Sequence, residues 1–397
     1  MQPFQRDSYQ KTFGSRVAEV RQDDAGDWVR LETTYFYPTS GGQPHDTGVL
    51  EALGSEAQVT DVLRNAEGIW HRLGGSVFPV GESVSGLLDW ERRYRHMQRH
   101  SAQHLLSQVF VQLNPAFETR AVSLMGPICT LDLALGLTPE DLLHAEVLVN
   151  RVGYAALPIT AFEIDEGDLG RYPLRRPPKV KGRIRLVQMG DFELSACGGT
   201  HLRSTAEALP IKLLGQSRVK GGLSRIRFMA GWEALDDYRA KHEALSVMAL
   251  GFSAQTEEVS ARVEGLRQEH SDLKGQLKES RTHQSRLLAD SLQQRQPGGK
   301  IVHVLAQTDS DLLGPLAQEL VGQAGTVALL AAVTGDRAQL LFAKHEGAPG
   351  DMRTALEAAL TPLSGRGGGS ALRAQGSGDA ERLEEALAAA ARKLEVH

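Results

Sequence analysis

Arg99-His100-Ser101-Ala102-Gln103-His104-Leu105-Leu106 is the stretch that decides how this chain is organised. It predicts a helix, because neither Gly nor Pro interrupts it and its apolar residues, continuing to Phe110, recur with a helical period. Residues i and i+4 of a helix lie one above the other, so His100 and His104 should point the same way, with Cβ atoms about 5–6 Å apart. Two imidazoles placed in this way supply half of a tetrahedral zinc site.

The other half is Cys197-Gly198-Gly199-Thr200-His201, where paired glycines let the backbone fold tightly between a cysteine and a histidine. Taken alone, a helical histidine pair is more often a surface or capped pair than a pair of metal ligands. A lone Cys-x-x-x-His is also only a weak indication of a metal site. Both in one chain favour a metal site with His100, His104, Cys197 and His201 as ligands for Zn²⁺. Because the two halves are distant in sequence, we expect a site inside a folded domain, with one position open to water or substrate.

The composition is that of an ordinary water-soluble protein long enough for two or three domains. The 397 residues are 41% hydrophobic and 23% charged, with a net charge of -5. No apolar run has the length of a membrane span, and the N-terminus lacks an apolar signal core, so we expect a cytoplasmic protein without membrane contact. The two cysteines, Cys129 in an apolar context and Cys197, argue against a disulfide-stapled secreted protein.

Basic residues flank both motifs in three runs. The runs are Arg92, Arg93, Arg95 and Arg99; Arg171, Arg175, Arg176, Lys179, Lys181, Arg183 and Arg185; and Lys212, Arg218, Lys220, Arg225 and Arg227. A basic run is usually a solvated face, but three runs converging on one metal site favour a polyanionic substrate.

Residues 1–90 alternate apolar and polar residues over 16–21 and 27–34, which predicts a β-rich region. The segment from Tyr35 to Gly48 is either a turn punctuated by Pro and Gly or a loop whose Thr39, Ser40 and Gln43 line a small pocket. Residues 91–240 predict an α+β domain, with a β-like stretch over 121–133 and a helix that begins after Thr138. Further strands are expected at 157–164, 183–189, 208–216 and 224–230.

Residues 232–294 are strongly helical in pattern, and five apolar residues fall at heptad-like positions. They are Val263, Leu266, Leu273, Leu277 and Leu287. This favours a coiled-coil or arm-like spacer, with a connecting helix packed on its own domain as the alternative. Beyond it, strands at 300–306, 326–332 and 339–343 alternate with helices at 312–321 and 352–360. The glycine-rich segment 365–370 is either a phosphate-cradling loop or a flexible linker.

Taken together, these motifs resemble the editing half of alanyl-tRNA synthetase and the freestanding AlaX alanyl-tRNA editing proteins. The resemblance rests on Phe36-Tyr37-Pro38-x-Ser40-Gly41-Gly42-Gln43-x-x-Asp46-x-Gly48, His100-x-x-x-His104-Leu105-Leu106, Cys197-Gly198-Gly199-Thr200-His201, Arg225-Ile226 before Gly231, and the glycine pattern after Gly367. These segments occur in family order along nearly the whole chain, which indicates a long-form AlaX protein.

The resemblance implies an α+β protein in four parts. They are a small β-barrel-like N-terminal domain with the Gly-Gly-Gln loop (1–90), a zinc-containing α+β editing domain (91–240), a helical or coiled-coil spacer (241–297) and a C-terminal α/β DHH-associated domain (298–397). We expect that such a chain can form a homodimer through the spacer or the C-terminal domain.

The resemblance also implies a trans-editing deacylase that hydrolyses Ser-tRNA(Ala) or Gly-tRNA(Ala) with a zinc-assisted water, while the basic runs track the acceptor stem. It identifies the four metal ligands above and places Gln43 and Ser101 in the catalytic site. Ser101 stands where the family usually has Thr. The substrate-binding candidates are Thr39, Ser40, Gly41, Gly42, Thr200 and Arg225, with Thr39, Ser40 or Ser101 reading a seryl hydroxyl.

Two rival functions stay open. One is deacylation of another mischarged tRNA, as in the related editing domain of threonyl-tRNA synthetase; the other is non-catalytic tRNA binding with a structural zinc. A general base is also unassigned: Asp191 and Glu193 lie close to Cys197 in sequence, but the direction of their side chains is not determined by the sequence.

Overall fold

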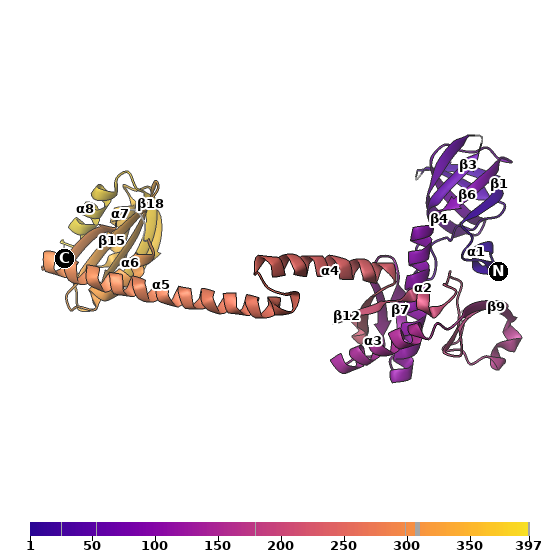
Figure 1. Ribbon diagram of the computed structural model, residues 1–397. Helices are drawn as coiled ribbons and strands as arrows, with labels where there is room; N and C mark the ends of the chain where they lie inside the picture. The colour runs from indigo at the N-terminus through magenta and orange to yellow at the C-terminus, as the bar shows by residue number, and fades with distance from the viewer. Residues whose placement is uncertain (25, 53, 179, 298, 306–309, 396–397) are drawn as a thin grey trace. The chain divides into compact units, whose positions relative to one another are not determined.

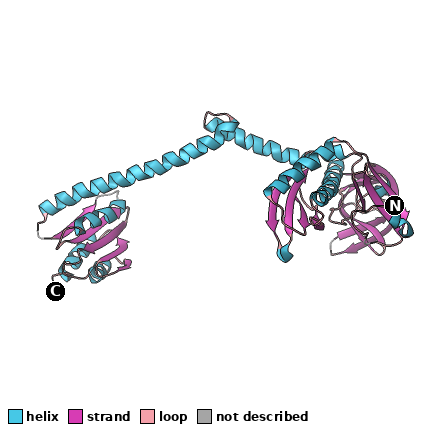
Figure 2. Ribbon diagram, turned by 90° about the horizontal axis from the view of Figure 1, so that it is seen from below, coloured by secondary structure: helices cyan, strands magenta, loops and turns pink. Residues whose placement is uncertain are grey.

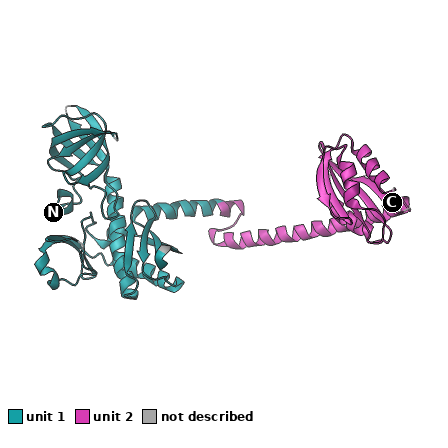
Figure 3. Ribbon diagram, turned by 180° about the vertical axis from the view of Figure 1, so that it is seen from behind, with its two compact units in different colours: residues 1–247 teal, residues 248–397 magenta. Residues whose placement is uncertain are grey.

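The computed structural model describes residues 1–397 apart from 25, 53, 179, 298, 306–309 and 396–397 (Figure 1). The chain forms two compact units, Met1–Val247 and Met248–His397, which Figure 3 shows in different colours. Both units contain helices and strands (Figure 2), which confirms the α+β class. The finer division into four domains stays a prediction. Within the described residues, no helix combines the length and the apolarity needed to cross a membrane.

The first unit opens with helix α1 (Pro3–Arg6) and a closed six-stranded barrel, so the expected small β-barrel is confirmed. Around the barrel the strands are β1 (Thr12–Asp23), β2 (Gly26–Leu31), β5 (Gly68–Gly75), β4 (Ser55–Asn65), β3 (Gly48–Ala52) and β6 (Ser83–Leu88). Side chains alternate between core and solvent, as in β6, where every second residue is buried. The strand expected over 27–34 ends at Leu31, and residues 32–47 leave the barrel as a long loop.

Helix α2 (Trp90–Leu113) is the predicted histidine helix, and the Asp89 side chain caps its N-terminus by accepting from Arg92 N. Its apolar face packs on an antiparallel sheet of β12 (Ile211–Arg218), β13 (Ser224–Ala230), β8 (Cys129–Leu133) and β7 (Thr119–Ser123). Helix α3 (Pro139–Tyr154) begins with the predicted Thr138 cap, which forms a capping box with Asp141. Cys129 lies in this core, in agreement with the apolar context of its segment.

A second antiparallel sheet of β9 (Ile159–Asp165), β10 (Arg183–Met189) and β11 (Glu193–Ala196) leads directly into Cys197. Short 3₁₀ turns η1 (Glu166–Arg171), η2 (Thr205–Ala208) and η3 (Lys220–Gly222) join the strands. The strands predicted at 183–189 and 224–230 are confirmed with the same bounds.

The helical segment predicted over 232–294 is two helices, α4 (Trp232–Gly251) and α5 (Val259–Arg295), separated by a turn and η4 (Thr256–Glu258). Gly251 ends α4, and Ser253 has a positive φ of 49°, which a helix cannot contain. The five heptad-like residues of α5, from Val263 to Leu287, are 40–57% exposed. A dimer through this stripe stays a prediction.

The second unit contains a five-stranded sheet in the order β14 (Lys300–Leu305), β15 (Val327–Thr334), β16 (Arg337–Lys344), β18 (Arg373–Asp379) and β17 (Arg366–Gly369). Helix α6 (Ser310–Val321) covers one face; α7 (Met352–Leu360) and α8 (Leu383–Lys393) cover the other. β15 is buried on both faces: Leu329 packs toward α7 and α8, and Leu330 toward α6.

The glycine-rich segment 365–370 is not a loop or a linker, which corrects both sequence interpretations. It forms β17, whose backbone pairs with β18 from Arg366 opposite Ser377 to Gly369 opposite Ala374. A Cβ on Gly367 would lie 2.5 Å from Gln375 O and 2.6 Å from Gly376 Cα. The glycines therefore serve the close approach of backbone segments rather than chain flexibility.

Candidate metal centre and its pocket

Helix α2 and the turn after β11 bring together the four residues predicted as metal ligands. Cys197 Sγ lies 3.3 Å from Nε2 of both His100 and His201, and the ligand atoms of these residues and His104 all lie within 4.8 Å of one another. A tetrahedral zinc ion with bonds of about 2.0–2.3 Å separates its ligand atoms by about 3.5 Å. The donor set and spacing therefore fit such an ion, whose identity stays a prediction.

Each histidine is fixed through its second ring nitrogen. His100 Nδ1 lies 2.7 Å from Gln43 Oε1, and His201 Nδ1 lies 3.3 Å from Ser101 Oγ. His104 Nδ1 lies 3.0 Å from Ser195 Oγ and 3.3 Å from Glu193 Oε2. Partners at Nδ1 leave Nε2 for a metal in all three rings, which is the usual arrangement of ligating histidines.

The protonation states of the cluster follow from burial and mutual charge. Burial raises the pKa of Cys197, but His100, His201 and His104 lower it more, to well below 9.0. Burial and the neighbouring His100 lower the pKa of His201 to about 3. Burial lowers the pKa of His104, but Glu193 and the Cys197 thiolate outweigh it and raise that pKa to about 9. A thiolate and a neutral imidazole are metal-binding forms, whereas an ion that binds at His104 displaces a proton.

The Cys197–His201 turn is held tightly against the helix. A Cβ on Gly199 would lie 2.1 Å from His100 Cε1, so only glycine fits there. The buried Arg185 donates to Cys197 O at 2.7 Å and Gly199 O at 3.1 Å. Gln5 of α1 donates to Gly198 O at 2.8 Å.

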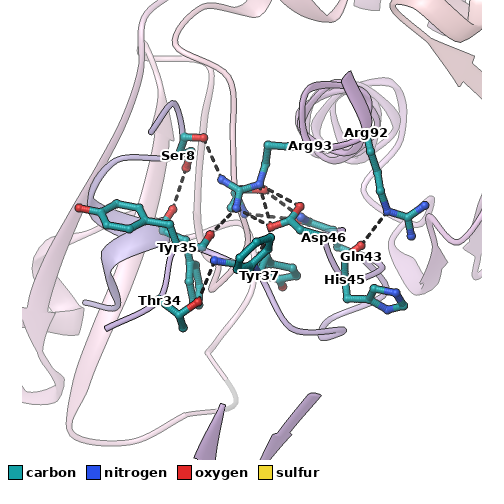
Figure 4. Close-up of polar contacts among 12 residues, drawn as sticks. Ser8, Thr34, Tyr35, Tyr37, Gln43, His45, Asp46, Arg92 and Arg93 are labelled. Atoms are coloured by element: carbon teal, nitrogen blue, oxygen red, sulfur yellow. Dashed lines mark hydrogen bonds and ion pairs between the residues drawn. The ribbon is translucent and has the colours of Figure 1, made fainter. Parts of the chain in front are cut away.

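A buried ion pair ties the loop that carries Gln43 to the helix that carries His100 (Figure 4). Arg93 Nε lies 3.0 Å from both carboxylate oxygens of Asp46, and its two Nη atoms donate to Ser8 O and Tyr35 O. Asp46 Oδ2 also accepts from Tyr37 N at 2.6 Å. Arg93 and Asp46 are both fully buried, so the loop is fixed two helical turns before His100.

A cavity of about 470 Å³ opens beside the ligands. Its walls include Tyr37, Ser40 and Gly41 of the loop, Gln103 of α2, Arg120 and Val122 of β7, and Arg175, Arg176 and Ser195 near β11. Tyr37 donates its hydroxyl to Ser40 O at 3.1 Å, and burial raises the pKa of Tyr37 above its ordinary value. The loop therefore presents Ser40 and the Gly41 backbone to this space.

The other predicted site residues lie in different surroundings. Gln43, Ser101 and Thr200 are fully buried behind the ligands, with Gln43 Nε2 donating to Thr200 Oγ1 at 2.8 Å. Thr39 is bound to His45, the Gly42 carbonyl accepts from Leu124 N, and Arg225 pairs with Asp132 at 2.7 Å on the four-stranded sheet.

The basic runs are only partly available to a substrate, because several of their arginines are already paired within the fold. Arg93 and Arg99 form buried ion pairs, with Asp46 and Glu233 respectively. Arg175 pairs with Glu193 at 3.4 Å, and Arg185 supports the ligand turn. A run of basic residues in the sequence does not distinguish an arginine that pairs with a buried carboxylate from an arginine that is solvated.

Two partners of His104 were not predicted from the sequence: Glu193 had no assigned role, and Ser195 was not among the candidates. Both lie in β11, and Cys197 follows the strand at the next alternate position, so the period of two places all three on one face. That spacing could have identified the partners of His104. By contrast, Arg93 and Asp46 are 47 residues apart and give no local pattern.

Comparisons with known proteins match two segments of the first unit. Residues 184–227, which include Cys197 and His201, match the family described as Threonyl and Alanyl tRNA synthetase second additional domain. Residues 9–92, which form the barrel, match the family described as tRNA synthetases class II (A).

Among curated proteins, the Alanyl-tRNA editing protein AlaX-L of Pyrococcus horikoshii is 30% identical over 99% of this chain and 98% of its own length. The Alanine--tRNA ligase of Pelotomaculum thermopropionicum is 33% identical over 94% of this chain, which spans 44% of that ligase. A solved structure, the C-Ala domain from Aquifex aeolicus alanyl-tRNA synthetase, is matched over 24% of this chain and 89% of that domain, at 22% identity and a TM-score of 0.23.

Proposed function

This chain belongs to the AlaX-L family of alanyl-tRNA editing proteins, and from that premise we propose that it hydrolyses the ester bond of alanine tRNA charged with serine or glycine. The observation that carries the proposal is the group of His100, His104, Cys197 and His201 beside a cavity walled by the Ser40–Gly41 loop. The 3′ end of tRNA(Ala) is the partner that this cavity would accept.

The four ligands would hold Zn²⁺, which supplies a Lewis acid for an ester that is already activated. Gln43, Ser101 and the Glu193–Ser195 pair orient the histidines. Gln43 and Ser101 do not touch the substrate, because both are fully buried at Nδ1 of His100 and His201. Replacing Gln43 by Leu should weaken zinc retention about 10- to 100-fold, the usual cost of losing such a partner. Unchanged retention would remove this role.

Ser40 is the residue we assign to the amino-acid selectivity of the site. Of the three hydroxyls considered, Ser101 is buried behind His201 and Thr39 is bound to His45, whereas Ser40 lines the cavity. A site built to bind a substrate hydroxyl discriminates better than an apolar one. Ser40→Ala should lower kcat/KM for Ser-tRNA(Ala) more than for Gly-tRNA(Ala); equal losses would contradict the assignment.

The experiment that tests the function is deacylation of Ser-, Gly- and Ala-charged tRNA(Ala) by the purified full chain, with and without zinc. We expect zinc-dependent release of serine or glycine while Ala-tRNA(Ala) is spared. The assay includes mischarged threonine tRNA, because the matched family covers both threonyl and alanyl enzymes. No release from any substrate by folded, zinc-loaded protein would favour the non-catalytic alternative.

A further inference from the structure

A second cavity, of about 450 Å³, meets the ligand pocket at Cys197. Arg176, Ala196, Cys197 and Gly198 line both cavities. The second cavity is also walled by Arg64 near the end of β4. Because Cys197 is one of the four candidate ligands, a group bound in the second cavity lies next to the candidate metal centre.

This second cavity is built to attract an anion. Four of its twelve lining residues are arginines: Arg64, Arg176, Arg183 and Arg185. Among the described residues that line it, Glu163 is the one carboxylate, and its oxygens are already engaged by the Met1 amino group at 2.6 Å and by Arg183 at 3.6 Å. Guanidinium groups gathered in a partly enclosed space favour phosphate, which they bind through parallel N–H donors.

Arg185 supplies a second, independent observation. It is 9% exposed and uses both Nη atoms on carbonyl oxygens, of Cys197 and Gly199 through Nη1 and of Gln5 through Nη2. Its Nε, however, has no hydrogen-bond partner within the described part of the chain. An unpaired buried donor is costly, so this N–H is available to an acceptor from outside the chain.

We propose that the arginine-lined cavity binds the 5′-phosphate of the terminal nucleotide that carries the aminoacyl ester. The inference rests on the proposed function, since that function places the ester beside the ligands. The esterified hydroxyl and the 5′-phosphate are at different ends of one ribose, so two neighbouring cavities with a shared wall can receive them together. Cys197 and Gly198 form such a wall, and Arg64 and Arg176 are the residues assigned to the phosphate.

The test compares two minimal substrates that differ only by the phosphate: the seryl ester of adenosine and the seryl ester of adenosine 5′-phosphate. We expect the wild type to show a kcat/KM about tenfold higher or more for the phosphorylated ester. This ratio should fall toward one in Arg64→Gln and in Arg176→Gln. The matched control is Arg16→Gln, an exposed arginine of the same barrel that is not among the residues lining either cavity; it should keep the ratio.

Binding of AMP and of adenosine, measured by calorimetry on the same folded proteins, separates the two proposals. If neither ester nor mischarged tRNA is hydrolysed, the proposed function fails, but tighter binding of AMP than of adenosine that is lost in Arg64→Gln still supports the cavity. If both esters are hydrolysed with equal kcat/KM, the function stands and the cavity assignment is overturned. Inorganic phosphate that binds as tightly as AMP would assign the cavity to free phosphate and overturn the nucleotide assignment.

Discussion

The two units of the chain differ in what they bury. In residues 1–247 the interior contains ion pairs such as Arg93–Asp46 and Arg99–Glu233, together with the histidines and their partners. In residues 248–397, Ser285 and Thr326 are the buried polar side chains among those described, and the core is otherwise Leu, Ala, Val, Phe, Ile and Met. Burying a polar group without a partner is costly, so most polar groups in a protein interior are paired.

This difference separates two ways of specifying a structure. The second unit depends on its two apolar clusters and on close backbone approach at its glycines. The first unit also depends on hydrogen bonds between buried polar groups, which hold Gln43, Glu193 and the ligand turn in place. Substitutions that remove one partner should therefore destabilise the first unit most. The loss of stability should increase with the burial of the remaining partner.

The two cysteines give the largest expected contrast. Cys197→Ser removes a ligand and should reduce bound zinc below about a tenth and deacylation by more than about 100-fold, since loss of a ligand's supporting partner alone costs about 10- to 100-fold. Cys129 lies in the apolar core and burial raises its pKa to about 12, so Cys129→Ser should keep zinc and lose about 1–3 kcal/mol of stability. Elemental analysis measures the bound zinc, and an unfolding experiment measures the stability. Equal zinc loss in the two variants would contradict the assignment.

Arg93→Met tests the ion pair that joins the loop to α2. It leaves the Asp46 carboxylate buried and uncompensated, which costs about 3–5 kcal/mol. Hydrogen exchange should report faster opening of the barrel and α2, with β15 and β16 of the second unit unchanged. The double variant Arg93→Met/Asp46→Asn should recover part of the loss, because the buried charge is gone. A single-variant loss below about 1 kcal/mol would show that the loop is held by other contacts.

His71 makes the stability of the barrel depend on pH. It is fully buried, with Nδ1 3.1 Å from Val29 O and Nε2 2.8 Å from Thr34 Oγ1, and burial lowers its pKa to about 4. A histidine with a depressed pKa stabilises the fold above its unfolded pKa of about 6.5, and this contribution is lost as pH falls toward 4. The loss amounts to about 3 kcal/mol, from the shift of 6.5 to about 4.

Unfolding by urea between pH 7 and pH 4 measures this effect, with His71→Gln as the control that does not titrate. The wild type should lose more stability over this interval than the variant, although the variant starts from a lower value. Parallel pH dependences in the two proteins would show that other groups titrate instead. The second unit should show no comparable difference between them.

Local spacing explains why some of this was predictable from sequence and some was not. The i, i+4 histidines, the Thr138 cap and the strands at 183–189 and 224–230 depend on neighbours in the chain, and the structure agrees with each. The break at Ser253 and the pairing of 366–369 with 373–379 depend on backbone conformation and on partners that composition does not reveal. Glu193 is an intermediate case. Its spacing from Cys197 could be recognised in the sequence, but its buried partners could not.

The smallest expected effect lies in the second unit, where two adjacent glycines should respond with opposite signs. A Cβ on Gly367 would meet Gln375 O at 2.5 Å, so Gly367→Ala should cost about 1–3 kcal/mol through displacement of the β17–β18 ladder. A Cβ on Gly368 would have no atom within 4 Å, so Gly368→Ala should gain about 0.4–1 kcal/mol by restricting the unfolded chain. Hydrogen exchange of β18 peptides measures both, with deacylation unchanged. If both variants lost stability equally, the glycines would be needed for the flexibility of the chain. The second unit would then not be fixed by close backbone approach, and its contrast with the polar interior of the first unit would not hold.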